Sequence, residues 1–89
     1  APTSGIVADV RRVAEQVPGV LGTHTCNVRK LGFDYVVDLE ILCDPALTIR
    51  EGHDIAHDVG EAIQRELPSV TRVLVHVEPV DDYGRRSRE

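Results

Sequence analysis

The last predicted strand of the chain carries an imidazole and a carboxylate two residues apart. Residues 73–79 read Val-Leu-Val-His-Val-Glu-Pro, so that valines alternate with Leu74, His76 and Glu78. Because a strand points successive side chains to opposite faces, His76 and Glu78 share the face that the valines do not occupy. Imidazole nitrogen and carboxylate oxygen both bind divalent metals. This face is therefore either part of a metal site or a solvated polar face.

Two further carboxylates, Asp38 and Glu40, alternate with apolar residues along the predicted strand 34–43. If this strand pairs with the last one, both carboxylates share a face with His76 and Glu78, since neighbouring strands lie about 5 Å apart. Such a group would lie within reach of one ion, which would relieve the repulsion between clustered carboxylates. On a solvent-exposed face, water screens the same repulsion. Periodicity alone leaves both interpretations open.

The other histidines lie on different predicted elements. His24 falls at the start of the first strand, whereas His53 and His57 lie one turn apart on the second helix. A pair of histidines at this spacing can bind a metal by itself. At 100° per residue, His53 lies beside the apolar stripe of the helix and His57 faces solvent, so that His53 is the better buried ligand candidate.

Composition limits the classes of protein to which the chain can belong. It has 89 residues, 42% of them hydrophobic, and a net charge of −5. The length predicts one small domain with one core. The negative charge argues against a nucleic-acid partner, and no apolar stretch approaches the roughly 20 residues that cross a bilayer. The chain lacks Met even at position 1, so we expect a piece of a longer protein or a processed product.

No enzymatic motif is present in the sequence. There is no glycine-rich phosphate loop and no nucleophile elbow, so the chain is not expected to be an enzyme. Cys26 and Cys43 do not form a Cys-x-x-Cys pair. They are expected to be reduced, half-buried thiols of a cytosolic domain, with a place in a soft-metal site as the alternative.

Five secondary-structure elements follow from the hydrophobic periods and the breaks between them. Thr48 and Glu51 form a capping box before the second helix, and Pro18-Gly19 and Pro68 end the two helices. The expected elements are a helix over 4–17, strands over 22–30 and 34–43, a helix over 49–66 and a strand over 71–78. Residues 1–80 form the predicted domain, and the charged segment 81–89 is predicted to be a disordered tail.

The order α-β-β-α-β predicts an α+β fold. Strand 22–30, the more polar of the first two, should form a hairpin with strand 34–43 and lie at a sheet edge. A right-handed crossover through the second helix should place strands two and three parallel. The result is a two-layer sandwich in which both helices cover one face of a three-stranded mixed sheet.

Three segments resemble one protein family. They are 17–24 (Val-Pro-Gly-Val-Leu-Gly-Thr-His) with the following Asn27-Val28-Arg29, then 44–56 (Asp-Pro-Ala-Leu-Thr-Ile-Arg-Glu-Gly-His-Asp-Ile-Ala), and 75–79 (Val-His-Val-Glu-Pro). Together they resemble the cytoplasmic C-terminal domain of cation diffusion facilitator transporters, over roughly residues 6–79. The run 47–55 also resembles the branch of that family associated with magnetosome formation.

The resemblance implies a metallochaperone-like fold, a variant of the ferredoxin-like fold, with the same order of elements. It implies a V-shaped homodimer on the cytosolic face of a membrane, a transmembrane domain upstream, and a divalent metal such as zinc, iron or manganese. The positions that match family ligands are His24, His53, His76 and Glu78. Asp38 matches a ligand of the magnetosome branch, which implies iron and the magnetosome membrane. Glu40 stands where several zinc transporters have His.

The expected function is therefore that of a regulatory cytosolic domain, in which metal binding closes a homodimer and supports cation efflux. Two alternatives remain open. One is a dimerisation scaffold of the same fold that does not sense metal. The other is a soluble ferredoxin-like regulatory domain, which would bind an amino-acid-like ligand between a helix and a strand.

Overall fold

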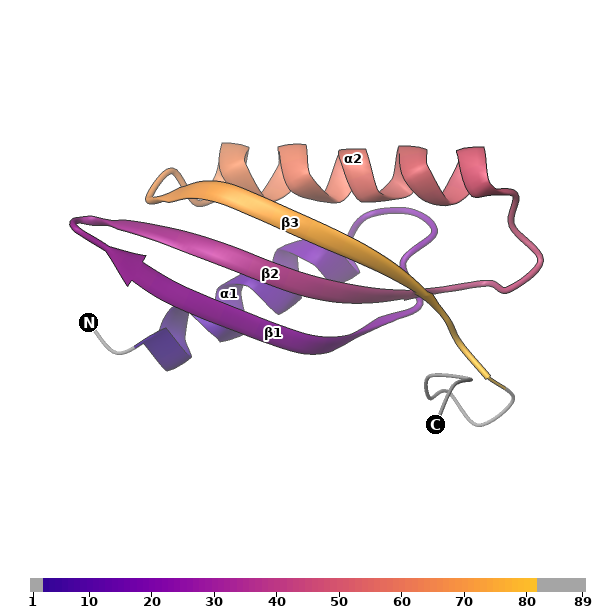
Figure 1. The fold of residues 1–89 in the computed structure, drawn as a ribbon, viewed down its shortest axis with the longest axis horizontal. Coiled ribbons are helices and arrows are strands. Elements are labelled where there is room, and N and C mark those ends of the chain that lie inside the picture. Colours follow the sequence, from indigo (N-terminus) through magenta and orange to yellow (C-terminus); the bar gives the residue numbers. More distant parts are fainter. Residues whose placement is uncertain (1–2, 82–89) are drawn as a thin grey trace.

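Two helices lie against one face of a three-stranded sheet in the computed structural model of the chain, which describes residues 3–81 (Figure 1). The elements are α1 (Thr3–Glu15), β1 (Gly22–Leu31), β2 (Asp34–Cys43), α2 (Ile49–Glu66) and β3 (Val70–Pro79). The predicted order and the two-layer α+β architecture are thus confirmed. Most of the predicted tail, residues 82–89, lies outside the described residues.

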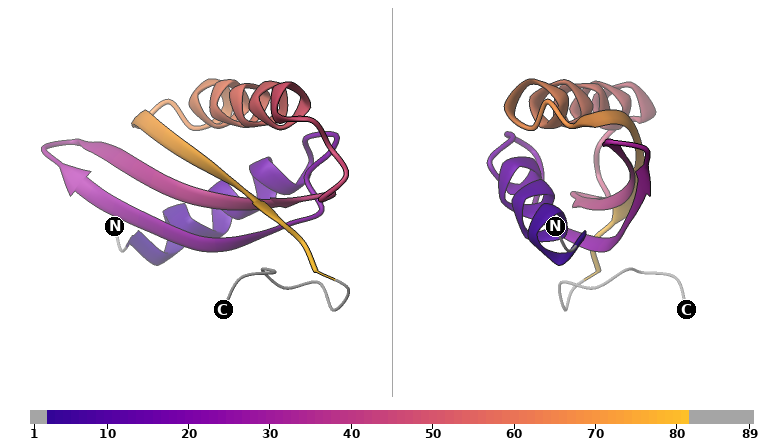
Figure 2. Two further views of the ribbon diagram at one scale, coloured as in Figure 1. Left: turned by 45° about the vertical axis from the view of Figure 1, so that its right-hand side comes forward. Right: turned by 90° about the vertical axis from the view of Figure 1, so that its left-hand side faces the viewer.

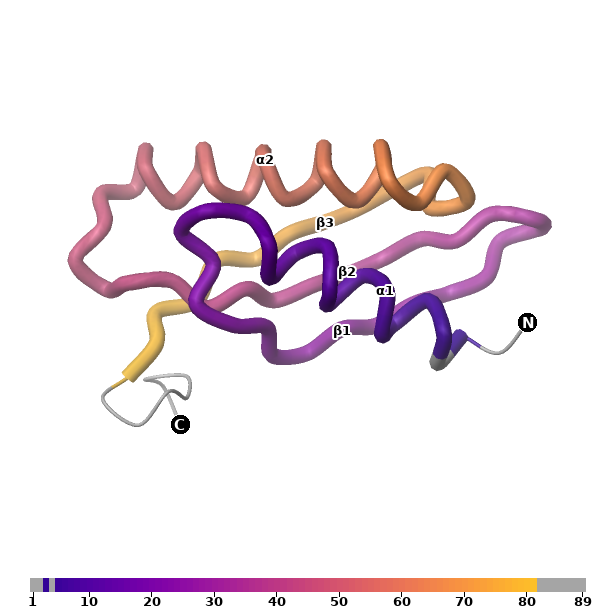
Figure 3. Tube along the Cα trace, turned by 180° about the vertical axis from the view of Figure 1, so that it is seen from behind, coloured from indigo at the N-terminus to yellow at the C-terminus, as the bar shows by residue number. Residues whose placement is uncertain are grey.

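The sheet has the strand order β1-β2-β3, with β2 in the centre. β1 pairs with β2 antiparallel, and β2 pairs with β3 parallel, as the sequence predicted. β1 is an edge strand, also as predicted, and β3 forms the second edge. The end-on view shows both helices on one side of the curved sheet (Figure 2), and the reverse view shows α1 crossing in front of the strands (Figure 3).

A two-residue loop joins β1 to β2. Leu31 pairs with Asp34, which leaves Gly32 and Phe33 as the loop. Gly32 has φ 64°, and no described residue other than glycine has a positive φ. A glycine with positive φ at the first loop position, followed by a residue with negative φ, is the pattern of a type II′ turn, whose twist matches that of the strands.

The first helix is shorter at its C-terminal end than predicted. It ends at Glu15 rather than residue 17. The N–H groups of Gln16 and Val17 donate to carbonyls only three residues back, at 3.2 and 3.1 Å, so the chain tightens as it leaves the helix. Pro18 disfavours helical geometry at the residue before it. The hydrophobic period extends through Val17, beyond the end of the helix. The prediction from this period therefore made the helix too long.

The second helix has the predicted bounds and the predicted capping box. The N–H of Glu51 donates to Thr48 Oγ1 at 3.0 Å, and the N–H of Thr48 donates to Glu51 Oε1 at 2.9 Å. These bonds satisfy backbone donors that have no partner within the helix. Neither helix of the described residues is long and apolar enough to cross a membrane.

The core lies between the helices and β2. The buried side chains are aliphatic with few exceptions, and the main ones are Val10, Val13, Ala14, Val37, Leu39, Ile41, Val59 and Ile63. Cys43 also belongs to this layer and is only 1% exposed, so the expectation of a half-buried thiol was wrong for Cys43 and right for Cys26. Cys43 continues the row of inward-facing residues on the central strand, which both helices cover.

Candidate metal site

The sheet face opposite the helices carries the predicted ligands of β2 and β3. The register pairs Glu40 with His76, Leu42 with Glu78 and Asp38 with Leu74. Register partners on neighbouring strands point to the same face, and that face alternates with the buried row of β2. The parity argument therefore placed Asp38, Glu40, His76 and Glu78 on one face correctly.

An irregularity in β1 brings His24 to this face. The pairing shifts between Thr23, which lies opposite Ile41, and Cys26, which lies opposite Leu39. His24 and Thr25 thus together oppose Glu40, which is the arrangement of a β-bulge. His24 Nδ1 lies 3.2 Å from Glu40 Oε1, and the N–H of Thr25 donates to the same oxygen at 3.4 Å. The bulge joins one imidazole and one carboxylate from different strands.

Side chains of α1 hold the start of β1. Arg11 Nη1 donates to Thr23 Oγ1 at 2.9 Å and to the carbonyl oxygen of His24 at 2.6 Å. Thr23 Oγ1 in turn donates to Glu15 Oε2 at 2.9 Å. The helix and the bulge are therefore connected through a charged network next to His24. Sequence reasoning assigned no role to Arg11, whose only signal was its place off the apolar stripe.

The histidines of α2 lie away from the sheet row. His53 is exposed within the single chain, so the burial expected of it is not found there, and its role as a ligand stays a prediction. The buried face of α2 begins at Gly52, against Val77, and a glycine adds nothing to a hydrophobic pattern. His53 follows Gly52 directly and is turned by about 100° from it, so it lies off that face. His57 is exposed as predicted, and its Nε2 lies 3.3 Å from Glu61 Oε2.

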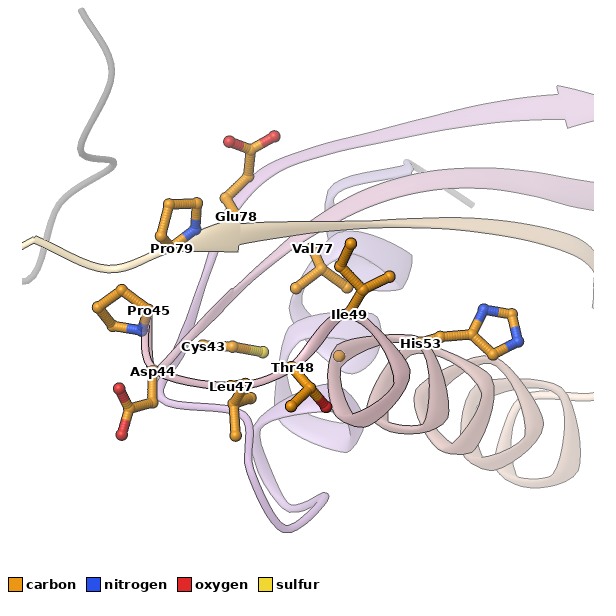
Figure 4. A pocket seen from close by; sticks show the side chains of 11 residues that line it. Cys43, Asp44, Pro45, Leu47, Thr48, Ile49, His53, Val77, Glu78 and Pro79 are labelled. Atoms are coloured by element: carbon orange, nitrogen blue, oxygen red, sulfur yellow. The ribbon is translucent and has the colours of Figure 1, made fainter.

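A groove of about 390 Å³ separates the start of α2 from the end of β3. His53 and Glu78 both line it, together with Ile49 and Val77. The imidazole of His53 and the carboxylate of Glu78 point in different directions around the exposed side chain of Ile49 (Figure 4). The groove thus brings these two predicted ligands to one region without joining them.

Within residues 3–81 of a single chain, no three His, Cys, Asp or Glu side chains approach closely enough to hold a metal ion. The structure brings His24 and Glu40 together, with His76 next to Glu40 in the register. It leaves Asp38, His53 and Glu78 apart from that pair. One chain therefore does not form the group that parity suggested, and the ligand set stays a prediction.

Residues 2–80 match the family described as cation efflux protein, cytoplasmic domain. The chain belongs to this family. The cation-efflux pump FieF of Pectobacterium atrosepticum is 32% identical over 81 residues, which cover 88% of this chain and 27% of that protein. Metal tolerance protein C1 of Arabidopsis thaliana is 32% identical over 74 residues, which cover 79% of this chain and 15% of that protein.

Solved structures of the MamM C-terminal domain share the fold of this cation efflux domain. One has a TM-score of 0.85 and 27% identity, and the match covers 88% of this chain and 99% of the MamM chain. Variants of that domain were solved in manganese, copper, nickel and cadmium forms. The metallochaperone-like fold and the resemblance to the magnetosome-associated branch are confirmed at this level.

The donors that this cation efflux domain presents on its outer face are nitrogen and oxygen. Both thiols lie on the side of the helices, because Cys26 pairs with the inward-facing Leu39 and Cys43 is buried. Burial raises the pKa of Cys26, an effect that the charge of Arg11 partly opposes, and burial also raises the pKa of Cys43. Imidazole and carboxylate without thiolate suit borderline to hard divalent ions.

Proposed function

We propose that this chain is the regulatory cytosolic domain of a divalent cation efflux transporter, and that metal binding draws two copies of it together. The two relatives are longer proteins, and the chain spans 15% of one and 27% of the other. The proposal therefore includes a transmembrane domain elsewhere in the same protein. From the resemblance to the magnetosome-associated branch, it extends to the magnetosome membrane as a location and to iron as a transported metal.

The observation that carries the proposal is the row of polar side chains across the outer face. His24 and Glu40 lie 3.2 Å apart, and His76 is the register partner of Glu40. A bulge beside a sheet edge commonly re-aims a side chain at a functional site. Here it directs an imidazole to a carboxylate on the central strand, and the three strands offer donors at neighbouring positions.

This donor set supports zinc, iron or manganese as the regulatory metal. A neutral imidazole and a carboxylate bind each of these ions. The forms in which MamM variants were solved also include several divalent metals, which supports broad metal binding in this fold. Because imidazole binds metal only when unprotonated, metal binding should weaken on acidification.

A second copy of the chain would supply the missing ligands. Metal sites in proteins generally have four or more ligands, whereas His24 and Glu40 are two. Asp38, His53 and Glu78 are the candidates to approach from the partner. Leu74, which pairs with Asp38, is 56% exposed and gives the same face an apolar contact for a dimer. Tighter binding to the closed arrangement would shift the dimer towards closure.

The test is calorimetric titration of the chain with Zn²⁺, Mn²⁺ and Fe²⁺. Glu40→Gln and His76→Ala should each lower the affinity by roughly tenfold or more, because each removes a donor. His57→Ala is the matched control, since it removes an exposed histidine that pairs with Glu61 on α2. Small-angle scattering should show compaction of the wild type on addition of metal. Equal affinity in all three variants would reject the ligand assignment.

The scaffold alternative also draws on a specific observation, the lack of a three-ligand group within residues 3–81 of one chain. It predicts a dimer of constant dimensions with and without metal and no heat of binding. The same titration and scattering experiment therefore separates the two functions. The remaining alternative, a domain for an amino-acid-like ligand, has no support in the family match.

A further inference from the structure

The β1–β2 hairpin presents the most exposed apolar side chains of one end of the molecule. Phe33 is 94% exposed and Leu31 is 65% exposed. Phe33 is also the only phenylalanine of the chain. The tight turn at Gly32 holds both side chains at the tip, and the core contains neither of them. An exposed aromatic and an adjacent exposed leucine at a turn form a small wedge that folding of this chain does not require.

Positive charge surrounds this wedge. Lys30 Nζ lies 5.7 Å from the ring centroid of Phe33 and 6.0 Å from that of Tyr35, within the range of a cation–π interaction. Arg29 and Arg72 flank Val36 in the next row of the sheet, and both are exposed. Within residues 29–36 at the hairpin tip, the only carboxylate is that of Asp34. The chain as a whole carries a net charge of −5, so the charge at this end is opposite in sign to that of the whole chain.

The wedge lies at the end of the molecule where α1 begins. The hairpin tip and the first turn of α1 occupy the same end in opposite views, whereas α2 begins at the other end (Figures 1 and 3). The groove lined by Ile49 and Glu78 lies at that far end, with the carboxylates of Asp44 and Glu78. The domain therefore has a basic, apolar-tipped end beside its N-terminal helix and an acidic end opposite.

We propose that the hairpin end, formed by Arg29, Lys30, Leu31, Phe33 and Arg72, docks on the anionic headgroup surface of the membrane. This inference rests on the proposed function, which includes a transmembrane domain in the same protein. An aromatic ring and a leucine enter the interfacial layer of a bilayer, and flanking cations attract anionic lipids. A single tip of this size binds weakly, and the covalent link to a membrane domain raises its effective concentration at the surface.

Docking at this end has a consequence for regulation. It would hold each copy by its hairpin end, while the ligand row and the acidic end remain free to approach a second copy. Bound lipid would therefore fix the point about which the domain moves when metal draws the two copies together. Salt should weaken the attachment, because exposed charges are screened within about 8 Å at physiological ionic strength.

The test uses the lack of tryptophan in this chain. The Phe33→Trp variant places the only tryptophan of the chain at the tip, and Ile49→Trp is the matched control, since Ile49 is 93% exposed at the opposite end. On addition of phosphatidylglycerol vesicles, the emission of Phe33→Trp should move to shorter wavelength, whereas that of Ile49→Trp should not move. Phosphatidylcholine vesicles should give a much smaller shift, and added salt should reverse the shift.

A charge reversal tests the electrostatic part. Adding Lys30→Glu to the Phe33→Trp variant should lower the vesicle partition coefficient about thirtyfold. One cation near an anionic surface raises this coefficient about fivefold, and replacing it with an anion both removes that attraction and adds a repulsion of similar size. Equal shifts for both tryptophan positions, or equal partitioning into both lipids, would overturn the proposal. A shift that depends on protein concentration without vesicles would instead make the tip a contact between copies, and would also overturn it.

The same samples separate this inference from the proposed function. Metal titration of Phe33→Ala should give the wild-type affinity, because the tip contains no predicted metal ligand. Metal binding without vesicle binding would reject the docking proposal alone. Vesicle binding without metal binding would reject the metal-sensing function and leave the docking surface in place.

Discussion

Arg11 should stabilise the fold and position His24, although it is not itself a predicted ligand. Its guanidinium donates to Thr23 Oγ1 at 2.9 Å and to the His24 carbonyl at 2.6 Å. A hydrogen bond contributes about 0.5–1.5 kcal/mol, and one with a charged partner contributes more. After the substitution, water can donate a hydrogen bond to the exposed His24 carbonyl, so we take the lower end of this energy range for that bond. We therefore expect Arg11→Ala to lower the free energy of unfolding by about 2 kcal/mol in total.

The assay is thermal unfolding followed by circular dichroism. For a domain of this size, a loss of about 2 kcal/mol corresponds to a fall in Tm of roughly 8–16 °C. Arg12→Ala is the matched control, because it removes the same side chain from the next position of α1. Among residues 3–81, Arg12 forms only an exposed pair with Asp9 at 3.2 Å, which contributes about 0.5 kcal/mol or less. Equal Tm values for the two variants would refute the stabilising role of the network.

The same two variants test the positioning role through metal titration. If His24 binds metal, Arg11→Ala should lower the affinity by about tenfold, as loss of a supporting residue commonly does. Arg12→Ala should leave it unchanged. A variant that loses stability but keeps its metal affinity would show that the bulge holds its geometry without Arg11, or that His24 is not a ligand. Arg11→Lys keeps the charge and one donor group, so its metal affinity should lie between those of Arg11→Ala and Arg12→Ala.

Two further predictions concern the packing of the fold. Gly19 has φ 95°, and a Cβ there would lie 2.5 Å from Ile55 Cδ1, so Gly19→Ala should cost about 2 kcal/mol. Gly5→Ala, which meets nothing within 4 Å in α1, should leave thermal stability equal or higher. Burial raises the pKa of Cys43 above its ordinary value of 9.0, so stability should be full below that pH and fall as pH rises through the raised pKa. Urea unfolding from about pH 8 to 10 should show a smaller fall for Cys43→Ala, and an equal fall would contradict this.

The elements that sequence reasoning placed best were those with two independent signals. The bounds of α2 followed from a hydrophobic stripe together with the capping box of Thr48 and Glu51 and the break at Pro68. The bounds of β2 followed from alternation together with turn residues at both ends. The end of α1 had one signal, a hydrophobic period that Val17 continues after the helix has stopped. Val17 is apolar because it packs against the core, although it lies outside the helix. The hydrophobic period therefore cannot mark the end of the helix.

The face of a side chain was predictable from the sequence, whereas its distance to another side chain was not. Period two fixed the common face of Glu40 and His76, because a one-residue slip would have turned the apolar row outward. The bulge that brings His24 within 3.2 Å of Glu40 has no such signal, since it inserts one residue into an already polar edge strand. Arg11 reaches across from α1 to the carbonyl of His24 in this bulge, which is a tertiary contact that no local pattern contains.

Asp38 illustrates the same limit for the ligand set as a whole. It lies on the predicted face, yet its register partner on β3 is Leu74, which has no donor to offer a metal. Its register partner on β1 is Asn27, which offers only an amide, so any imidazole or further carboxylate for an ion at Asp38 must come from outside this row of the sheet. A second copy of the chain is the nearest source under the proposed function, and the exposed Leu74 is an apolar surface that such a copy would cover. Whether a polar face binds metal thus depends on what approaches it, which a pattern within one chain does not contain.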